Sequence, residues 1–231
     1  MPIPTDSIRA SDLKPMPYGR TRAANIKNGI WEPLWGGRRA LIDVFETGIG
    51  IRDEVGDPLD GFDLLRAAIG EAVTASELVL DGYLMPAPLR STEGIDAVPG
   101  MDSIPSAVEM GRQLLVGGGM NSRRDALDAD RSRHMPVPSE SPTAFVAIDL
   151  LWLDGEPLIE VPLAERKRLL EAVLRDGELV RRTVSVRGPV EAWYPQWLAQ
   201  GFREVVVKGA NSRYTPGVPH PEWATALIPR R

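Results

Sequence analysis

The sequence predicts an α+β fold, in which helices pack against mainly antiparallel strands. Segments with the two-residue alternation of strands and segments with the apolar periodicity of helices follow one another along the chain. They do not alternate strictly as strand, helix and strand, which a doubly wound parallel sheet would require. With 231 residues, the chain is also long enough to bury a sizeable core.

The first part of the chain contains three predicted elements after an irregular start. Residues 1–30 are rich in proline and arginine, and we expect an extended N-terminal segment. β-Branched and apolar residues at 39–54 surround Thr47-Gly48, which predicts a hairpin. Residues 60–75 predict a helix, and residues 76–85 predict a strand. The apolar face of the predicted helix consists of Phe62, Leu65, Ile69 and Val73.

Residues 86–142 are the least regular stretch, rich in proline, glycine, serine and arginine. One helix is predicted within it, around residues 106–115. Such a long irregular stretch inside a compact domain is usually a functional loop, a lid or a partly disordered segment. Because its charges nearly balance, we interpret it as a surface insertion into a domain that spans residues 31–231, and not as a DNA-binding arm.

The second part of the chain begins with residues 144–155, which are apolar on both faces apart from Asp149 and predict a buried central strand. Residues 162–177 predict a helix that starts at a proline and ends at Asp-Gly.

Two further strands, over residues 179–186 and 203–208, flank a helix over residues 190–198. Pro195 is expected to kink this helix.

Composition limits the function classes. The net charge of −5 argues mildly against strong non-specific binding to nucleic acid. The absence of cysteine excludes disulfides, thiolate metal sites and a cysteine nucleophile. No apolar run is long enough to span a membrane and no secretory signal is evident, so we expect a cytoplasmic protein without membrane association. A mechanism that needs a reactive amine has four lysines to choose from: Lys14, Lys27, Lys167 and Lys208.

Four segments, in this order and spacing, resemble motifs of the nucleotidyltransferase (adenylation) domain of ATP-dependent DNA ligases. "WEPLWGGRRAL" at 31–41 is similar to Glu-Pro-Lys-(aromatic)-Asp-Gly-x-Arg, and "ELVLDGYL" at 77–84 is similar to a motif built on Asp-Gly-Glu. Residues 144–170 resemble the strand and helix that follow. "GFREVVVKGANSRYTPG" at 201–217 resembles Gly-x-Glu-Gly-Val-Val-x-Lys followed by Ser-x-Tyr-x-Pro-Gly.

The resemblance covers the chain from about Lys14 and implies a ligase-type, ATP-grasp-like domain with two mainly antiparallel sheets and helices. In this family a lysine attacks the α-phosphate of ATP and holds AMP before passing it to a DNA 5′-phosphate. That chemistry needs a neutral amine, carboxylates for a divalent metal and cations for the phosphates. The oligonucleotide-binding (OB) domain that follows in ligases is not expected in this chain.

The resemblance places several replaced residues at motif positions. These are Leu34 at the nucleophilic lysine, Gly36 at the aspartate two residues later, Tyr83 at the third-motif glutamate, Arg203 at the fourth-motif glutamate, and Thr225 and Leu227 at the two lysines of the fifth motif. A hydrocarbon has no lone pair, so Leu34 cannot attack a phosphate. We therefore predict no catalytic residue and no metal site among them.

Other motif residues are retained: Glu32, Arg39, Asp81, Asp149 and Lys208. For the aromatic that stacks on adenine, either Phe145 fills the role or Ile148 stands in its place. A shift by one residue would put Glu204 at the fourth-motif glutamate, but it would misplace Lys208, and we keep the unshifted register. The candidates for binding nucleotide or phosphate are Glu32, Arg39, Phe145, Arg203 and Lys208; of these, Arg39, Arg203 and Lys208 are expected to form a metal-independent phosphate site.

The sequence thus predicts a ligase-like pseudoenzyme that has lost self-adenylation and acts by binding a nucleotide, a nucleic-acid end or a DNA-repair protein. No cofactor is implied with certainty: ATP is compatible with the retained residues, whereas the lost carboxylates argue against Mg²⁺. One alternative is an active nucleotidyltransferase that uses a relocated lysine, Lys27 or Lys208. Another alternative is a structural subunit of a ligase or end-joining complex, with residues 86–142 as its partner surface.

Overall fold

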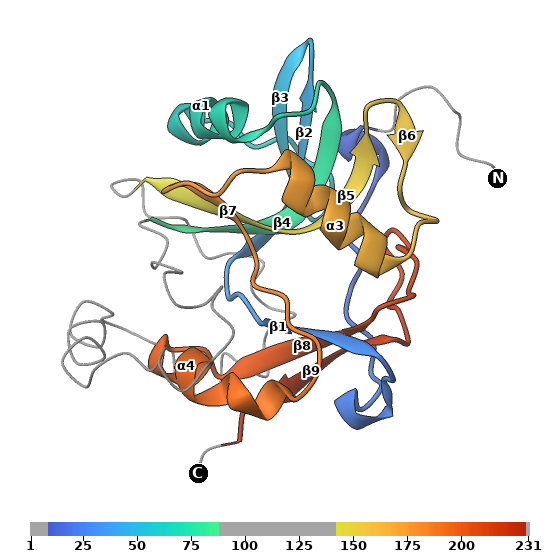
Figure 1. The fold of residues 1–231 in the computed structure, drawn as a ribbon. Helices are drawn as coiled ribbons and strands as arrows, with labels where there is room; N and C mark the ends of the chain where they lie inside the picture. Colours follow the sequence, from blue (N-terminus) through green and yellow to red (C-terminus); the bar gives the residue numbers. More distant parts are fainter. Residues whose placement is uncertain (1–8, 88–141, 230–231) are drawn as a thin grey trace.

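The structure is a computed structural model that describes residues 9–87 and 142–229 (Figure 1). The helix predicted around residues 106–115 lies outside the described residues. No helix in the described ranges is long and apolar enough to cross a membrane.

Two sheets make up the body of the protein. The larger sheet has the strand order β3 (Gly48–Asp53), β2 (Arg38–Phe45), β4 (Leu78–Pro86), β5 (Thr143–Leu153) and β6 (Glu156–Pro157), and β7 (Val180–Arg182) pairs beside β5. The smaller sheet has the order β1 (Gly29–Pro33), β8 (Glu204–Gly209) and β9 (Trp223–Leu227). Every pairing between these strands is antiparallel except that of β5 with β7. The α+β prediction is confirmed.

Helix α1 (Asp63–Ala72) lies beside the larger sheet and α4 (Tyr194–Ala199) beside the smaller one, whereas α3 (Leu163–Val173) packs on the larger sheet and also reaches β1 of the smaller sheet through Lys167 (Figure 1). Helices α1 and α3 lie on the larger sheet, and their buried residues Leu65, Ile69 and Leu170 share one core with strands β2, β4 and β5. Helix α4 packs on the smaller sheet, with Trp197 fully buried. Each helix therefore covers an apolar cluster of the sheet on which it packs.

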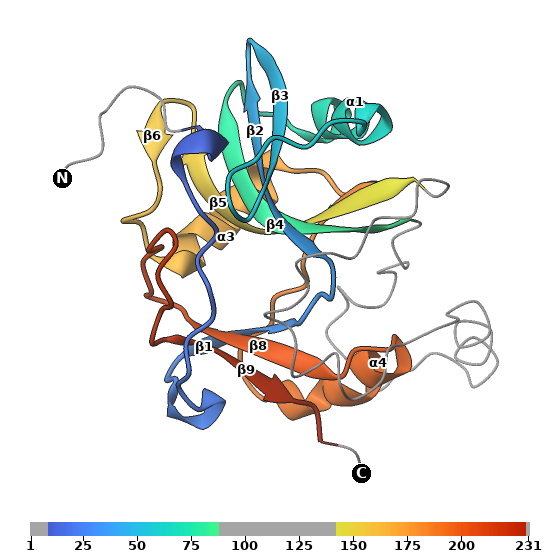
Figure 2. The same ribbon diagram turned by 180° about the vertical axis from the view of Figure 1, so that it is seen from behind.

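The N-terminal segment connects the two sheets. It contains two short 3₁₀ helices, η1 (Ala10–Asp12) and η2 (Ala23–Asn25), so the described part is less extended than predicted. Leu13 and Met16 are buried in a core that also contains residues of both sheets. Figure 2 shows this blue segment running from beside β5 down to the smaller sheet. Its packing makes it part of the core.

The predicted hairpin is confirmed: β2 and β3 pair from Ala40 with Asp53 to Phe45 with Gly48. Gly48 has a φ of +123°, a conformation that a side chain would strain. Gly82, in the middle of β4, has a different role. A Cβ there would lie 2.3 Å from the carbonyl oxygen of Val146 and 2.4 Å from the ring of Phe145 on β5, so only glycine fits.

Two predictions in the second part were wrong in detail. The helix over residues 190–198 is divided into η4 (Val190–Ala192) and α4, with Pro195 in the first turn of α4. Proline is tolerated there because the first-turn N–H groups have no partner within the helix, so it does not kink a continuous helix. The strand predicted over residues 179–186 is limited to β7, with one further isolated bridge between Val186 and Trp31.

Candidate functional site

The site implied by the motifs lies between the two sheets, where β1 and β8 present one face. Side chains alternate along a strand, so Glu204 and Lys208 share a face of β8, and Glu32 lies on β1, which ends one residue before Leu34. The backbone N–H of Leu34 donates to the carbonyl of Glu204 over 3.0 Å, which places these residues side by side. Burial raises the pKa of the Glu204 carboxyl. Leu34, which the resemblance places at the nucleophilic lysine, is thus half-buried and bonded through its backbone to Glu204.

Glu32 is buried, with 1% of its surface exposed, and it is held by two lysines. Lys208 Nζ donates to Glu32 Oε2 over 2.7 Å, and Lys167 Nζ forms an ion pair with Glu32 Oε1. The hydroxyl of Ser185 donates to Oε1 over 3.1 Å. Burial by itself would raise the pKa of Glu32, but the two ammonium groups hold it below its ordinary value. Glu32 is therefore an internal counter-ion.

Lys208 is completely buried, and its Nζ lies 4.4 Å from the centre of the Trp223 ring. Lys208 is therefore not a strand-end lysine whose ammonium group reaches water.

Lys167, on α3, was one of the four lysines available as a reactive amine, but it was not among the candidates for binding nucleotide or phosphate. Burial and the nearby charge of Lys208 lower its pKa to about 8, although Glu32 opposes this. Its place in the sequence, next to an arginine on an amphipathic helix, gave no sign that it would reach strand β1.

A second buried network surrounds Asp81 on β4. Arg39 donates to both carboxylate oxygens, from Nε over 2.5 Å and from Nη2 over 2.6 Å. Tyr214 donates its hydroxyl to Asp81 over 2.7 Å. Arg39 Nη1 also donates to the hydroxyl of Tyr83 over 2.9 Å, and the Tyr83 and Tyr18 hydroxyls are hydrogen-bonded over 2.8 Å. Every one of these residues has a partner inside the protein.

The three tyrosines of this network stay uncharged. Burial raises the pKa of Tyr18, Tyr83 and Tyr214, and the negative charge of Asp81 adds to the effect. For Arg39, burial opposes the charged form, but Asp81 and the two tyrosines near it hold its pKa above the ordinary value. One guanidinium and one carboxylate thus neutralise each other in a largely buried setting.

The retained Asp149 has a structural role. Its carboxylate accepts two hydrogen bonds from Arg166 on α3, each over 2.8 Å, and both side chains are completely buried. Burial alone would raise the pKa of Asp149, but Arg166 holds it below the usual range. Arg166 also donates to the carbonyl of Ser212 over 3.2 Å, so the pair connects β5, α3 and the segment after β8.

The structure decides between the two candidates for the adenine-stacking position. Phe145 is completely buried in the core beneath α1, with Leu80 and Ala147, and it does not face the motif residues. Its selection as a nucleotide-binding candidate was wrong, because β5 turns alternate residues to opposite faces. Ile148 lies in a different cluster, which contains Trp35 and Tyr83. The aliphatic Ile148, and not Phe145, therefore lies on the face of β5 that packs with Trp35 and Tyr83.

Arg203 does not join Arg39 and Lys208. It is exposed, and its Nη1 donates to the carbonyls of Leu198 and Phe202 at the end of α4, over 3.2 and 3.0 Å. It precedes Lys208 by five residues, about 16 Å along an extended strand. The expected three-cation phosphate site was wrong for this reason, and because the other two cations are already paired with Asp81 and Glu32.

The remaining replaced positions lie at the surface. Gly36 is exposed, with no atom within 4 Å of a Cβ built there. Thr225 and Leu227 are exposed on β9, and 68% of Leu227 is accessible to solvent. None of these residues supplies a charge to the space between the sheets.

The described residues fit Mg²⁺ and ATP poorly. Magnesium prefers carboxylate and water ligands, but Asp81 already accepts three hydrogen bonds and Tyr83 stands where a second carboxylate would be needed. Within residues 9–87 and 142–229, no group of three or more His, Asp or Glu side chains could hold a metal ion. Trp35, the residue after Leu34, lies in a buried cluster with Tyr83 and Ile148.

Comparison with solved structures shows which fold the chain has. The structure is similar to that of a mycobacterial DNA ligase D in complex with ATP and MES, with a TM-score of 0.61 and 21% identity, over 94% of this chain and 61% of that one. It is also similar to the ligase domain of LigD from M. tuberculosis, with a TM-score of 0.59 and 22% identity, over 95% and 61%. The fold is that of a ligase-type nucleotidyltransferase domain.

The sequence comparisons name the family. Residues 120–225 match the family model of the ATP dependent DNA ligase domain. Over 94% of its length, the chain aligns at 26% identity with the multifunctional non-homologous end joining protein LigD of Mycolicibacterium smegmatis. The alignment covers 24% of that protein. Over 36% of its length, the chain aligns at 36% identity with a DNA ligase of Methanopyrus kandleri, and this alignment covers 16% of that ligase. The chain is thus similar in sequence to ATP-dependent DNA ligases, and it spans less than a third of either relative.

Proposed function

We propose that this protein is a ligase-like domain that has lost self-adenylation and acts by binding, with a nucleic-acid end or a DNA-repair protein as its ligand. The observation that carries the proposal is Leu34, a hydrocarbon at the position that the motif resemblance gives to the nucleophilic lysine. The internal pairing of Glu32, Arg39 and Lys208 supports it, because groups that would contact phosphates already have partners. The buried cluster at Ile148 argues against ATP as the ligand of this cleft.

Two measurements test this proposal. Incubation with α-labelled ATP and Mg²⁺, followed by denaturing electrophoresis, should give no labelled protein, with an active ATP-dependent ligase as the positive control. Titration with nicked and with blunt DNA at several salt concentrations should show binding that weakens as salt rises, because phosphate contacts release counterions. A stable AMP adduct would refute the loss of self-adenylation. Failure to bind any DNA would remove the nucleic-acid ligand and leave the protein partner.

A relocated nucleophile is the second candidate function, and the structure changes which lysine would serve. Lys27 is exposed in the turn before β1, and Lys208 is buried against Glu32. Lys167, with its pKa lowered to about 8, is the amine with the largest neutral fraction for which a value is resolved. The same labelling experiment with Lys167→Met decides the matter: label that disappears in this variant would establish the relocated nucleophile.

A structural subunit is the third candidate, supported by a surface groove of about 620 Å³ beside α4. Tyr194, Pro195 and Leu198 give this groove an apolar lining, and Arg203 lies at its edge. Such a groove favours a protein partner over a nucleic acid, which prefers a positively charged surface. Co-purification with a complete ligase that is lost in Leu198→Asp, without DNA affinity in either protein, would support this candidate.

A further inference from the structure

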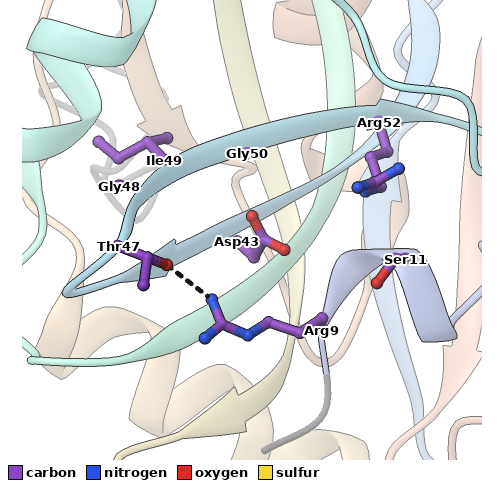
Figure 3. A pocket seen from close by; sticks show the side chains of 8 residues that line it. All are labelled: Arg9, Ser11, Asp43, Thr47, Gly48, Ile49, Gly50 and Arg52. Atoms are coloured by element: carbon purple, nitrogen blue, oxygen red, sulfur yellow. Dashed lines mark hydrogen bonds between the residues drawn. The ribbon is translucent and has the colours of Figure 1, made fainter.

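We infer that a pocket outside the cleft, between the N-terminal segment and the β2–β3 hairpin, is a binding site for a nucleoside monophosphate whose base carries an exocyclic amine. The pocket has a volume of about 340 Å³, at the small end of the range of ligand sites. It shares no lining residue with the motif positions between the sheets. Figure 3 shows Asp43 between Arg9 and Arg52, with its carboxylate turned into the pocket.

The first contact comes from Arg52, on β3. Its Nη1 donates to the carbonyl of Gly56 over 3.0 Å, which fixes the side chain. No carboxylate lies within ion-pair distance of Arg52 among the described residues, so its remaining N–H groups can donate to a ligand. A guanidinium group presents these donors in a planar fork that matches two phosphate oxygens.

The second contact comes from Arg9. Its guanidinium carbon lies 3.5 Å from the centre of the Phe45 ring, and Nη1 donates to the Thr47 hydroxyl over 3.3 Å. Contact with the ring covers one face of the planar guanidinium group. We assign the base of the ligand to the opposite face, because nucleic-acid bases stack on guanidinium planes.

The third contact comes from Asp43, which is 8% exposed. Its Oδ2 accepts a hydrogen bond from the backbone N–H of Ala10 over 3.1 Å. Its Oδ1 lies where a Cβ on Gly50 would be only 2.1 Å away, so the carboxylate fits because residue 50 has no side chain. A buried carboxylate oxygen in a pocket needs a donor, and the exocyclic amine of cytosine is one that carboxylates accept from.

The three groups together define the chemistry of the ligand. A simple anion would contact the two guanidinium groups but would also face the carboxylate of Asp43, which repels it. A ligand with a phosphate, a flat base and an amine donor satisfies all three groups. Cytidine monophosphate meets these demands. In uridine monophosphate a carbonyl oxygen replaces the amine and would point at the carboxylate.

The test is isothermal titration of the full chain with CMP and UMP without Mg²⁺, since these ligands differ at the group that Asp43 would contact. We expect CMP to bind at least about tenfold more tightly than UMP. Oligocytidylate and oligouridylate form the second arm, because the same chemistry could come from a free nucleotide or from one residue of a single strand. A preference for cytosine in either arm supports the site and identifies the source.

Variants locate the binding. Asp43→Asn keeps the size of the side chain and can place its amide N–H₂ in the pocket, so the preference for CMP over UMP should vanish or reverse. Arg52→Gln should reduce the difference between CMP and cytidine, whereas Arg22→Gln, the same change at an exposed position outside the pocket, should not. Thermal unfolding checks that each variant folds. Equal affinity for CMP and UMP, no binding of any ligand, or binding unchanged in both pocket variants would overturn the inference.

Discussion

The hydroxyl groups of Tyr18 and Tyr83 lie 2.8 Å apart, where the N-terminal segment meets strand β4. Tyr83 stands where the motif resemblance implies a glutamate, which would place a second carboxylate beside Asp81. The tyrosine instead gives an uncharged hydroxyl that accepts a hydrogen bond from Arg39 and meets Tyr18. The replacement has thus turned a charged position into part of the protein's own packing.

Breaking the ion pair of Arg39 and Asp81 should lower the free energy of unfolding much more than breaking the neighbouring ion pair of Arg38 and Asp53. Arg39 is 9% exposed and makes two hydrogen bonds to a fully buried carboxylate, so Arg39→Gln should lower the free energy of unfolding by about 3–5 kcal/mol. Arg38 is 34% exposed, and Arg38→Gln should cost about 1 kcal/mol or less. Urea unfolding of both variants measures the difference. Equal losses would contradict the argument that burial decides the cost.

The close approach of β4 and β5 predicts a strong effect at Gly82. Gly82→Ala places a methyl group 2.3 Å from the carbonyl oxygen of Val146, and backbone at this position cannot move aside cheaply. We expect a loss of about 2 kcal/mol or more by urea unfolding, in the range of overpacked cores. Gly36→Ala is the control, because nothing lies within 4 Å of its Cβ, and it should change stability by less than about 0.5 kcal/mol.

Lys167 should make stability depend on pH in the alkaline range. Its pKa is about 8 in the folded protein and 10.5 in the unfolded chain, so between these values the unfolded state binds more protons. The free energy of unfolding should therefore rise with pH across this window, by up to about 1.4 kcal/mol per unit from this group. The comparison with Lys167→Met isolates the effect, since this variant lacks the amine and keeps a similar length. Parallel pH profiles for the two proteins would show that Lys167 is not perturbed.

Glu32 gives a dependence of the same sign at acid pH. Its folded pKa is below the ordinary value, so the stability that it contributes is present at neutral pH and is lost as pH falls through the folded value. Glu32→Gln removes one negative charge between two lysines and should flatten the acid side of the profile while it lowers stability at pH 7. Denaturant melts at pH 7 and at pH 4 measure both effects. A variant as stable as the original protein at pH 7 would mean that the lysines do not need this counter-ion.

The sequence predicted the secondary-structure elements well where a local pattern was enough. The hairpin at Thr47-Gly48 and the buried strand around Asp149 follow from side-chain alternation and turn chemistry, and both were confirmed. The partners of the motif residues were not predictable in this way. Lys167 reaches Glu32 from a helix 135 residues further along the chain, and no periodicity encodes such a contact.

Phe145 and Arg203 show why the candidate site was only partly correct. Both were assigned from motif position, which says that a residue is near the site but not which face of its strand it occupies. Phe145 points into the core beneath α1, and Arg203 hydrogen-bonds to carbonyls at the end of α4. The pairing of β4 with β5 has a register shift between Asp81 and Gly82. Such a shift interrupts the alternation of side chains between the two faces, and the sequence alone did not reveal it.

Returning the missing lysine should not return the activity. Leu34→Lys would place an amine beside Glu204, with which it can form an ion pair, so the amine would be charged and a poor nucleophile. Tyr83 and Gly36 would still supply no carboxylate for a metal ion, and Asp81 would remain bound by Arg39. We therefore expect no AMP adduct from Leu34→Lys with α-labelled ATP and Mg²⁺. The triple variant Leu34→Lys, Gly36→Asp and Tyr83→Glu is the informative partner: label in the triple variant alone would show that the carboxylates are needed as well. Label in the single variant would mean that one side chain separates this protein from an active nucleotidyltransferase.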